Sequence, residues 1–453
     1  MMRDPARGTP TAGSGFALSN GSRAFRHRNY RLFFGGQLVS LVGTWMQQVA
    51  QAWLVLELTS DPLILGLVTA LAFLPVLILG LFGGLIADAL PKRKTLIGTQ
   101  TVQMLLAFTL FALVVTDTVQ VWQILVLATL LGITNAVDMP TRQAFTVEMV
   151  GREDVANAVA LNSAVFNGAR IVGPAIAGLT IGFFGGDVSA AFLINGLSFL
   201  AVIIAYAAMR DDELRVTGDY TRPTTMSQVR SSLADGLQYV RRHDLVLLMT
   251  ITVGLASTFG FNFGVIIPAL AKDVLGTDAT GYGILMAATG IGSLVAALGI
   301  AFSGRSRPVL APVGAIILGV ALAATSLVHL FPVALVTMLF VGFGAIAMAA
   351  TANTTIQLAV PDELRGRVIS VYTTVFVGST PLGALMMGWI ASTYGVPASF
   401  AVAGIGCLVT GALAIPWLAR IQARRGVRLA APASLGRSSI EAAPGGPLAT
   451  GPR

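Results

Sequence analysis

Long stretches without charged residues dominate this chain and limit what it can fold into. Apart from Arg170, they cover residues 32–56, 62–87, 95–116, 118–137, 155–186, 188–209, 245–271, 279–304, 308–361 and 368–419. A transmembrane helix needs about 20 largely apolar residues. Each of the last two stretches is long enough for two helices. We expect each to be divided by a turn that ends in proline, at His329–Pro332 and at Tyr394–Pro397. We therefore predict an all-α membrane protein with twelve transmembrane helices.

The positions of lysine and arginine support this division and orient the chain. With the N-terminus in the cytoplasm, 27 of the 29 Lys and Arg residues fall in tails or loops on the cytoplasmic side, where positive residues are retained. We expect a multi-pass protein of the cell membrane with both termini cytoplasmic. The exceptions are Lys272, on the far side, and Arg170, inside a predicted helix. Basic loops beside anionic membrane lipids explain the net charge of +8 without nucleic acid.

The two halves of the chain look like copies. Each contains an acidic-basic loop, then a Val-Phe pair, then glycine and proline. The matching segments are 148–154, Val165-Phe166 and Gly173-Pro174 in one half, and 360–365, Val375-Phe376 and Pro381 to Gly383 in the other. Duplicated six-helix units are typical of secondary transporters, whose substrate site lies between the halves. We predict two pseudo-symmetric bundles, residues 26–209 and 245–420, with a cytoplasmic tail at 1–25 and a disordered cytoplasmic tail at 421–453.

A polar segment, residues 210–244, separates the two bundles. Its second part is periodic, with apolar residues at Met226, Val229, Leu233, Leu237 and Val240. Steps of three and four predict an amphipathic helix on the cytoplasmic membrane surface. A plain linker and a partner-binding element are both compatible with this pattern, and we favour the linker.

Several classes of protein are excluded or disfavoured by what the chain lacks. It contains no Gly-Lys dipeptide and therefore no phosphate-binding loop for ATP. The histidines His27, His243 and His329 are scattered, so we expect neither an enzyme nor a metal or other cofactor. The single cysteine, Cys407, cannot form an intrachain disulfide. A membrane receptor or scaffold remains the rival from another class, although it would need no duplicated halves.

The segment after the second predicted helix resembles the cytoplasmic signature loop of the major facilitator superfamily. It reads Gly84-Leu-Ile-Ala-Asp88-Ala-Leu-Pro-Lys92-Arg93-Lys94. Gly84, Asp88, Lys92 and Arg93 match the family pattern, whereas Ala89 and Pro91 stand where arginine and a second glycine are usual. The resemblance implies that this loop gates the inward-facing side, and it implies the major facilitator fold.

The fifth predicted helix is similar to the Gly-Pro signature of exporters in this superfamily. It reads Gly168-Ala-Arg-Ile-Val-Gly173-Pro174-Ala-Ile-Ala-Gly178, with Ala177 in place of one glycine. Proline bends a helix and small residues allow close packing, so we predict hinges at Gly173, Pro174, Pro381 and Gly383. Close helix packing alone would explain the small residues equally well. Residues 43–55, 158–163 and 361–368 also resemble the exporter subgroup that includes enterobactin exporters and macrolide efflux pumps.

Arg170 is the central candidate for the substrate cavity. A cation in mid-membrane is costly unless it faces a polar cavity or a partner, so the alternatives are an internal ion pair or bonds to carbonyls. Gln37, Thr44, Gln48 and Gln51 recur on one helical face, which favours a cavity over pairwise hydrogen bonds between helices. The other predicted cavity residues are Trp45, Asn162, Asn167, Asn262, Asn353, Gln357 and Tyr372.

Proton coupling requires a titratable group that is exposed to each side in turn, and the chain offers only two weak candidates. Asp138 has Arg142 four residues on, so a structural ion pair is also expected there. Glu57 ends the first helix on the outside.

We predict a monomeric secondary transporter that exports a small amphipathic molecule, such as a siderophore or a macrolide, by alternating access and proton antiport. Import of a small anionic or neutral metabolite is the alternative. A central arginine, with no acidic pair on the first and seventh helices, disfavours a strongly cationic substrate.

Overall fold

The computed structural model describes residues 22–215, 226–303 and 307–430, and these residues are helical apart from short connections. We call residues 22–215 the N half; its helices are α2 (Arg28–Thr59), α3 (Pro62–Ala89), α4 (Lys92–Val115), α5 (Val121–Phe183) and α6 (Ser189–Ala207). Two short 3₁₀ turns, η1 (Arg23–Arg26) and η2 (Asp211–Glu213), flank this set. A helix can cross a bilayer because its backbone N–H and C=O groups are hydrogen-bonded within the helix itself.

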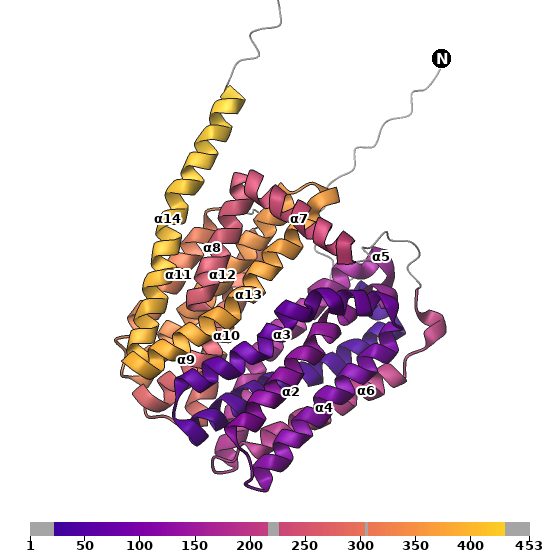
Figure 1. Ribbon diagram of the computed structural model, residues 1–453, viewed down its shortest axis with the longest axis vertical. Helices are drawn as coiled ribbons and strands as arrows, with labels where there is room; N and C mark the ends of the chain where they lie inside the picture. The colour runs from indigo at the N-terminus through magenta and orange to yellow at the C-terminus, as the bar shows by residue number, and fades with distance from the viewer. Residues whose placement is uncertain (1–21, 216–225, 304–306, 431–453) are drawn as a thin grey trace, which may run out of the picture.

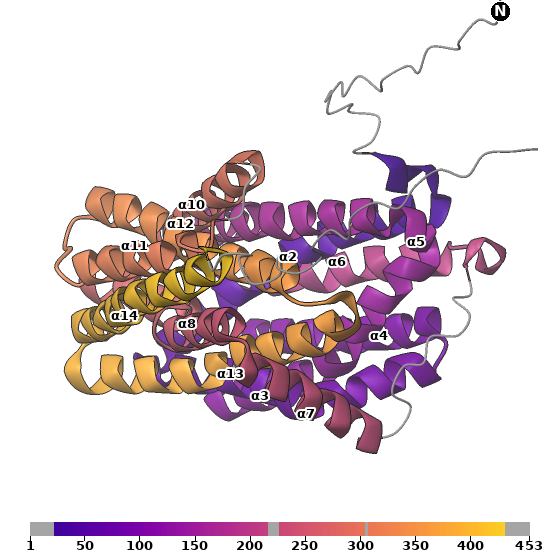
Figure 2. The same cartoon turned by 90° about the horizontal axis from the view of Figure 1, so that it is seen from above.

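The C half, residues 244–430, repeats the arrangement. Its elements are α8 (Asp244–Gly260), α9 (Phe263–Ala269), η3 (Leu270–Val274), α10 (Ala279–Ser303), α11 (Leu310–Thr325), α12 (Phe331–Ala359), α13 (Asp362–Tyr394) and α14 (Val396–Ala430). The two halves form two groups of helices, indigo to magenta and rose to yellow (Figures 1 and 2). The predicted breaks at 329–332 and 394–397 are confirmed, because α12 begins at Phe331 and Gly395 separates α13 from α14 with a φ of 91°.

The twelve spans of the prediction are present, although not all are separate helices. In the described part of the chain, nine helical segments are long and apolar enough to cross a membrane. One of them, α5, has 63 residues and contains two spans. The shorter apolar helix α11 and the more polar helix α2 complete the set.

Helix α5 differs most from the sequence-based boundaries. The fourth span was expected to end near Val137, followed by a loop, but the helix continues to Val150 and resumes directly after Gly151. Gly151 has a φ of 73° and a ψ of 175°, a conformation that side-chain-bearing residues rarely adopt, so a single glycine replaces the loop. As a result Arg142 lies within a helix and not in a loop.

Helix α7 (Met226–Arg242) is the predicted amphipathic helix, and it packs against the C half. Val240 is buried and Leu233 is partly buried, whereas the side chains of Met226 and Val229 lie outside the described residues. Arg367 on α13 donates to Asp235 of α7 at 2.8 Å, and Gly236 allows the α13 backbone to approach closely. The helix is therefore anchored to α13 as well as being amphipathic (Figure 1).

Helix α14 is longer than predicted. It was expected to give way to a disordered tail at residue 421, yet it is helical to Ala430 and projects beyond the other helices (Figure 1). Residues 431–453 lie outside the described residues. We call the end with the Lys- and Arg-rich connections the inner end and the opposite end the outer end.

The halves approach each other closely in their outer and central parts. Thr280 Oγ1 of α10 donates to Gly178 O of α5 at 3.1 Å, and Trp53 of α2 stacks on Tyr282 of α10 at 6.4 Å between ring centroids. Gly66 of α3 lies against the backbone of Ala384 in α13. Towards the inner end, by contrast, α13 exposes small polar side chains at Ser370, Thr373 and Thr374.

Close packing of small residues holds the helices together within each half, since apolar burial gives little preference for protein over lipid. At the crossing of α10 and α12, a Cβ on Gly342 would overlap with the carbonyl oxygen of Thr289. We expect Gly342→Ala to force these helices apart and to lower the free energy of unfolding by about 1–3 kcal/mol. Thermal unfolding in detergent would measure this. Gly299→Ala, in α10 with no atom within 4 Å, is the matched control and should leave stability unchanged; equal melting of the two variants would contradict the packing argument.

Candidate functional site

Arg170 lies where the two halves meet. Its guanidinium carbon is 5.9 Å from the ring centroid of Trp45 on α2 and 5.6 Å from that of Phe263 on α9. Both distances fall within the range of cation–π attraction. Trp45 in turn contacts the edge of Phe166, at 5.8 Å between ring centroids. The cation is thus held between an aromatic ring of each half.

The backbone around Arg170 explains why the side chain reaches both rings. Gly173, one turn later, packs against Trp45 Cβ, so α5 and α2 are in close contact there. On the opposite side, Gly290 of α10 lies against Ile171 and the carbonyl of Arg170. Small residues on both sides bring three helices together at the level of the guanidinium.

Neither of the two alternatives expected for Arg170 is seen in the described part of the chain. Among those residues, no carboxylate lies within ion-pair distance of its guanidinium, and no carbonyl accepts a hydrogen bond from it. An intramembrane cation without such a partner is a functional candidate by default. The guanidinium of Arg170 therefore has five N–H donors available for an acceptor group on a bound molecule.

The seventh span is discontinuous beside this cation. Helix α8 ends at Gly260 and α9 begins at Phe263, with Asn262 between them. The Asn262 Nδ2 donates to Thr258 O at 2.8 Å, while its Oδ1 is buried without a partner. Broken helices with free polar groups at mid-membrane are typical of transporter binding sites.

An aromatic wall continues from Phe263 into the C half. Phe261 contacts Phe263 at 5.6 Å and the edge of Phe376 at 5.3 Å, and Phe376 stacks on Tyr372 at 6.5 Å between centroids. Tyr372 also donates to Ala349 O at 3.2 Å. Tyr372 was predicted from the sequence, whereas Phe261 and Phe263 were not. Phe166 and Phe376 belong to the Val-Phe pairs that recur in both halves, and this repetition is a signal in the sequence that points to them.

The predicted polar stripe on α2 divides into two environments. Gln48 and Gln51 form no hydrogen bond within the described residues, and Gln48 is exposed, so their place in the cavity stays a prediction. Gln37 is 5% exposed and accepts a hydrogen bond from Arg142 at 3.0 Å, and its place in the cavity stays a prediction. The expected alternative, hydrogen bonding between helices, applies to it.

Each of the remaining predicted cavity residues forms a hydrogen bond within its own half. Asn162 Oδ1 accepts a hydrogen bond from Tyr30 at 2.9 Å within the N half, and the place of Asn162 in the cavity stays a prediction. Asn167 donates to Ser163 O at 2.8 Å on an exposed face of α5. Gln357 donates to Asn353 at 2.6 Å near the inner end of α12. Arg170, Trp45, Asn262 and Tyr372 therefore lie in or next to one series of aromatic contacts, whereas the place of the other polar residues in the cavity stays a prediction.

Asp138 is the centre of a buried network in the N half. Its carboxylate is 0% exposed and accepts hydrogen bonds from Thr99 at 2.7 Å, Gln100 at 2.9 Å and Arg142. The expected i,i+4 pair between Asp138 and Arg142 is present. Because Arg142 also bonds Gln37, the network ties α4, α5 and α2 together.

Glu57 lies at the outer end of α2. Its carboxylate accepts a hydrogen bond from Trp53 at 2.7 Å, and Lys272 is near enough to interact with its charge. Asp138 and Glu57 therefore lie at different places, one within the N half and one at the outer contact between the halves.

The basic residues of the predicted gating loop bind their own half. Lys92 forms an ion pair with Glu148 at 2.8 Å. Arg93 donates to the carbonyl of Tyr206 at 2.7 Å and to Asp211 at 2.6 Å. The side chain of Asp88 and the surroundings of Gly84 lie outside the described residues.

The proposed hinges lie at helix contacts. Gly173 packs on α2, and the carbonyl of Pro174 meets Gly283 of α10. Pro381 is buried in α13, and Gly383 lies against Thr258 O and Asn262. These contacts show close packing, while hinge motion at the four positions stays a prediction.

Asp154, which was not among the predicted site residues, holds the N-terminal segment on α5. Its carboxylate is 1% exposed, 2.7 Å from Arg26 and 2.9 Å from His27, with Arg23 at 3.6 Å. The hydrogen bond from His27 and the charges of Arg26 and Arg23 keep the pKa of this carboxyl below its usual range despite burial. Asp154 is therefore ionised at neutral pH and stabilises the inner end.

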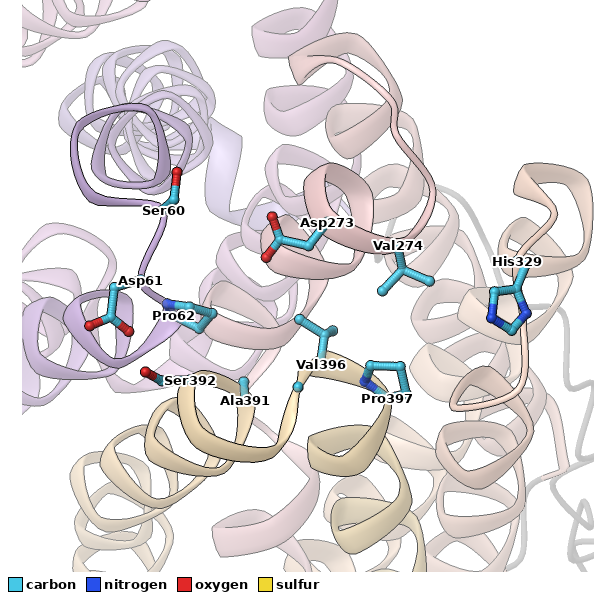
Figure 3. Close-up of a pocket in the computed structure, with 11 residues that line it drawn as sticks. Ser60, Asp61, Pro62, Asp273, Val274, His329, Ala391, Ser392, Val396 and Pro397 are labelled. Carbon is cyan, nitrogen blue, oxygen red and sulfur yellow. The ribbon is translucent and has the colours of Figure 1, made fainter.

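A pocket of about 500 Å³ opens at the outer end and not at Arg170. Its lining comes from both halves and includes Ser60, Asp61, Asp273 and His329 (Figure 3). Among the described residues, no group of three or more His, Cys, Asp or Glu side chains could hold a metal. The pocket contains none of the predicted cavity residues.

Comparison with known proteins gives a consistent result. Residues 20–430 match the family described as transmembrane secretion effector. The chain is 25% identical to the staphyloferrin A transporter of Staphylococcus aureus, over 83% of this chain and 93% of that protein. It is 29% identical to the multidrug efflux pump Tap of Mycolicibacterium fortuitum, with the same coverage, and 20% identical to macrolide efflux protein A of Streptococcus pyogenes, over 84% and 94%.

Solved structures share the fold at low identity. The inward-facing, unoccupied structure of a bacterial homologue of the human lysosomal transporter Spinster has a TM-score of 0.66 at 12% identity, over 89% of this chain and 96% of that one. The nucleoside transporter NupG has a TM-score of 0.68 at 9% identity, over 86% and 99%.

Proposed function

The chain belongs to the transmembrane secretion effector family of the major facilitator superfamily, and we propose that it exports a small amphipathic molecule that is anionic or neutral. It is a multi-pass membrane transporter, and siderophore, macrolide and multidrug efflux proteins are among its relatives. Siderophore-like and macrolide-like compounds are therefore the first candidates for its substrate.

The observation that carries this proposal is the guanidinium of Arg170 between Trp45 and Phe263. Flat aromatic surfaces suit the apolar part of an amphipathic molecule. The free guanidinium donors suit a carboxylate, a phenolate or a carbonyl. A quaternary amine would be repelled by the same cation.

We propose that export proceeds by alternating access between the two halves, as the duplicated architecture favours. We infer that this arrangement is the inward-open step of such a cycle, because the halves are in close contact in the outer part and α13 has exposed polar side chains towards the inner end. The predicted substrate region around Arg170 would then be reached from the inner end. Substrate transfer would require the outer contacts to open.

Protons are the coupling ion that we propose, with Asp138 and Glu57 as the candidate groups. Protonation of Asp138 would weaken the ion pair with Arg142 and free that cation inside the N half. Glu57 lies at the outer contact, where opening would expose it to the outside. Each group could thus change its surroundings during the cycle.

The distribution of basic residues supports the proposed location and orientation of the protein. We place the protein in the cell membrane with both termini in the cytoplasm and its basic connections beside anionic lipids. We propose that it works as a monomer, because the predicted substrate site is formed by the two halves of one chain.

Transport assays in cells with and without the protein test this function. We expect expressing cells to accumulate less of an anionic siderophore and of a neutral macrolide, and a protonophore to abolish the difference. A quaternary amine of similar size is the matched control and should accumulate equally in both strains. Selective export of the amine would contradict the proposed substrate class, and export that persists with the protonophore would exclude proton coupling.

A further inference from the structure

Lys272 is the one lysine or arginine that the sequence pattern assigns to a far-side connection. It lies in η3, a π-helical turn that continues α9 at the outer end of the C half. Such turns are rare and occur frequently at functional positions, because the extra residue redirects the side chains that follow. Here the side chain of Lys272 reaches the N half of the protein.

The partner of Lys272 is the last turn of α2. Its Nζ donates to the carbonyl oxygen of Leu56 and lies 3.4 Å from Ser60 Oγ. Ser60 ends α2 in a left-handed conformation with a φ of 50°. The final carbonyls of a helix carry partial negative charge, so they attract a cation. Lys272 is thus a cap that one half supplies to a helix of the other.

The contact is accessible to water from outside. Ser60 and Asp61 of the N half, and Asp273 of the C half, line the outer pocket of about 500 Å³ (Figure 3). Next to it, Glu57 is close enough to interact with the charge of Lys272. The interaction can therefore break without exposing a large apolar surface to water.

We propose that Lys272 is a latch that holds the outer ends of the two halves together. This proposal rests on the proposed alternating-access function. Within that function, Lys272 sets the equilibrium between the inward-open and outward-open states. Because the cap joins the halves only when the outer side is closed, it stabilises that state alone. A contact present in one state and absent in the other shifts the equilibrium between them.

The expected effect follows from the strength of a cation at a helix C-terminus. Loss of such a contact should raise the ratio of outward-open to inward-open molecules between about twofold and about 30-fold. The fold should survive, because the carbonyl oxygen of Leu56 also accepts a hydrogen bond from Ser60 N at 2.9 Å.

Distances between spin labels on opposite halves would measure this ratio. In a Cys407→Ala background, one pair of labels at Thr118 and Leu327 reports the outer ends, and a second pair at Lys94 and Glu363 reports the inner ends. All four positions are exposed. We expect Lys272→Met to enlarge the population with long outer and short inner distances.

Arg28→Met is the matched control, because it also removes a cation from a helix C-terminal carbonyl. Arg28 donates to Ala208 O at 3.1 Å, at the end of α6, so its contact lies wholly within the N half. We expect Arg28→Met to keep the wild-type distances. Lys272→Arg, which keeps a cation at the same place, should remain closer to the wild type than Lys272→Met.

The outcomes separate the latch from the transport cycle. If wild-type protein changes its distances with a transported compound while Lys272→Met keeps the wild-type populations, the latch is wrong and the cycle stands. If neither protein changes its outer or inner distances under any condition, alternating access itself fails. A shift in both methionine variants would also overturn the latch, because it would reflect a general loss of charge.

Discussion

Replacement of Arg170 by glutamine is expected to abolish export while the protein still inserts and folds. The substitution removes the cation that lies between Trp45 and Phe263 and the donors that an anionic substrate would need. We expect the initial rate of export of an anionic substrate to fall by roughly 10-fold or more, since each hydrogen bond between the guanidinium and a substrate acceptor contributes about 1.5–3 kcal/mol. Stability should be unchanged or higher, because an unpaired charge in the membrane is itself costly.

Export from cells and thermal unfolding in detergent would together check this prediction. Arg170→Lys provides the graded comparison: it keeps the charge but loses the planar group, so we expect export between those of the wild type and the glutamine variant. Arg215→Gln, which affects an exposed ion pair with Glu153 at the inner end, is the control for charge loss. Unchanged export by Arg170→Gln would remove this residue from the site.

Loss of Asp138 is expected to produce the largest loss of stability among these variants. Asp138→Ala would leave Arg142 without its carboxylate partner inside the N half. Removal of one partner of a buried pair usually costs about 3–5 kcal/mol. Three donors, on Thr99, Gln100 and Arg142, would lose their acceptor. The melting temperature of the purified protein should fall accordingly.

A second substitution separates the pair from the carboxylate alone. In Asp138→Ala/Arg142→Leu no unpaired charge remains, so we expect much of the stability to return, and the double-mutant cycle gives the coupling energy. The exposed pair between Asp235 and Arg367 is the control, because Asp235→Ala should cost less than about 1 kcal/mol. Equal destabilisation by Asp138→Ala and Asp235→Ala would show that the network has little structural importance.

Much of the fold could be predicted because the bilayer imposes simple requirements on a chain. Apolar length identified the spans, and proline and glycine placed the start of α12 within 329–332 and the end of α13 within 394–397. The i,i+4 pair between Asp138 and Arg142 also followed from spacing alone. These features depend on neighbours in the sequence.

Features that depend on neighbours in space were predicted less well. Gln37 shares a helical face with Gln48, yet it bonds Arg142 because α5 continues past Val137. Phe263 has nothing in its local sequence that points to Arg170; the break at Asn262 and the contact between the halves bring them together. Asp154 could not be paired with His27, which is 127 residues away.

By itself, the amino-acid sequence determined the number of spans, the duplication and the presence of a costly cation in the fifth span, because the free energy of placing residues in a membrane depends mainly on their composition and length. Only the tertiary structure decided what that cation faces, which glutamines are already bonded, and which helix end Lys272 caps. Those outcomes depend on close packing between helices, where a glycine or a single break in a helix determines which side chains meet.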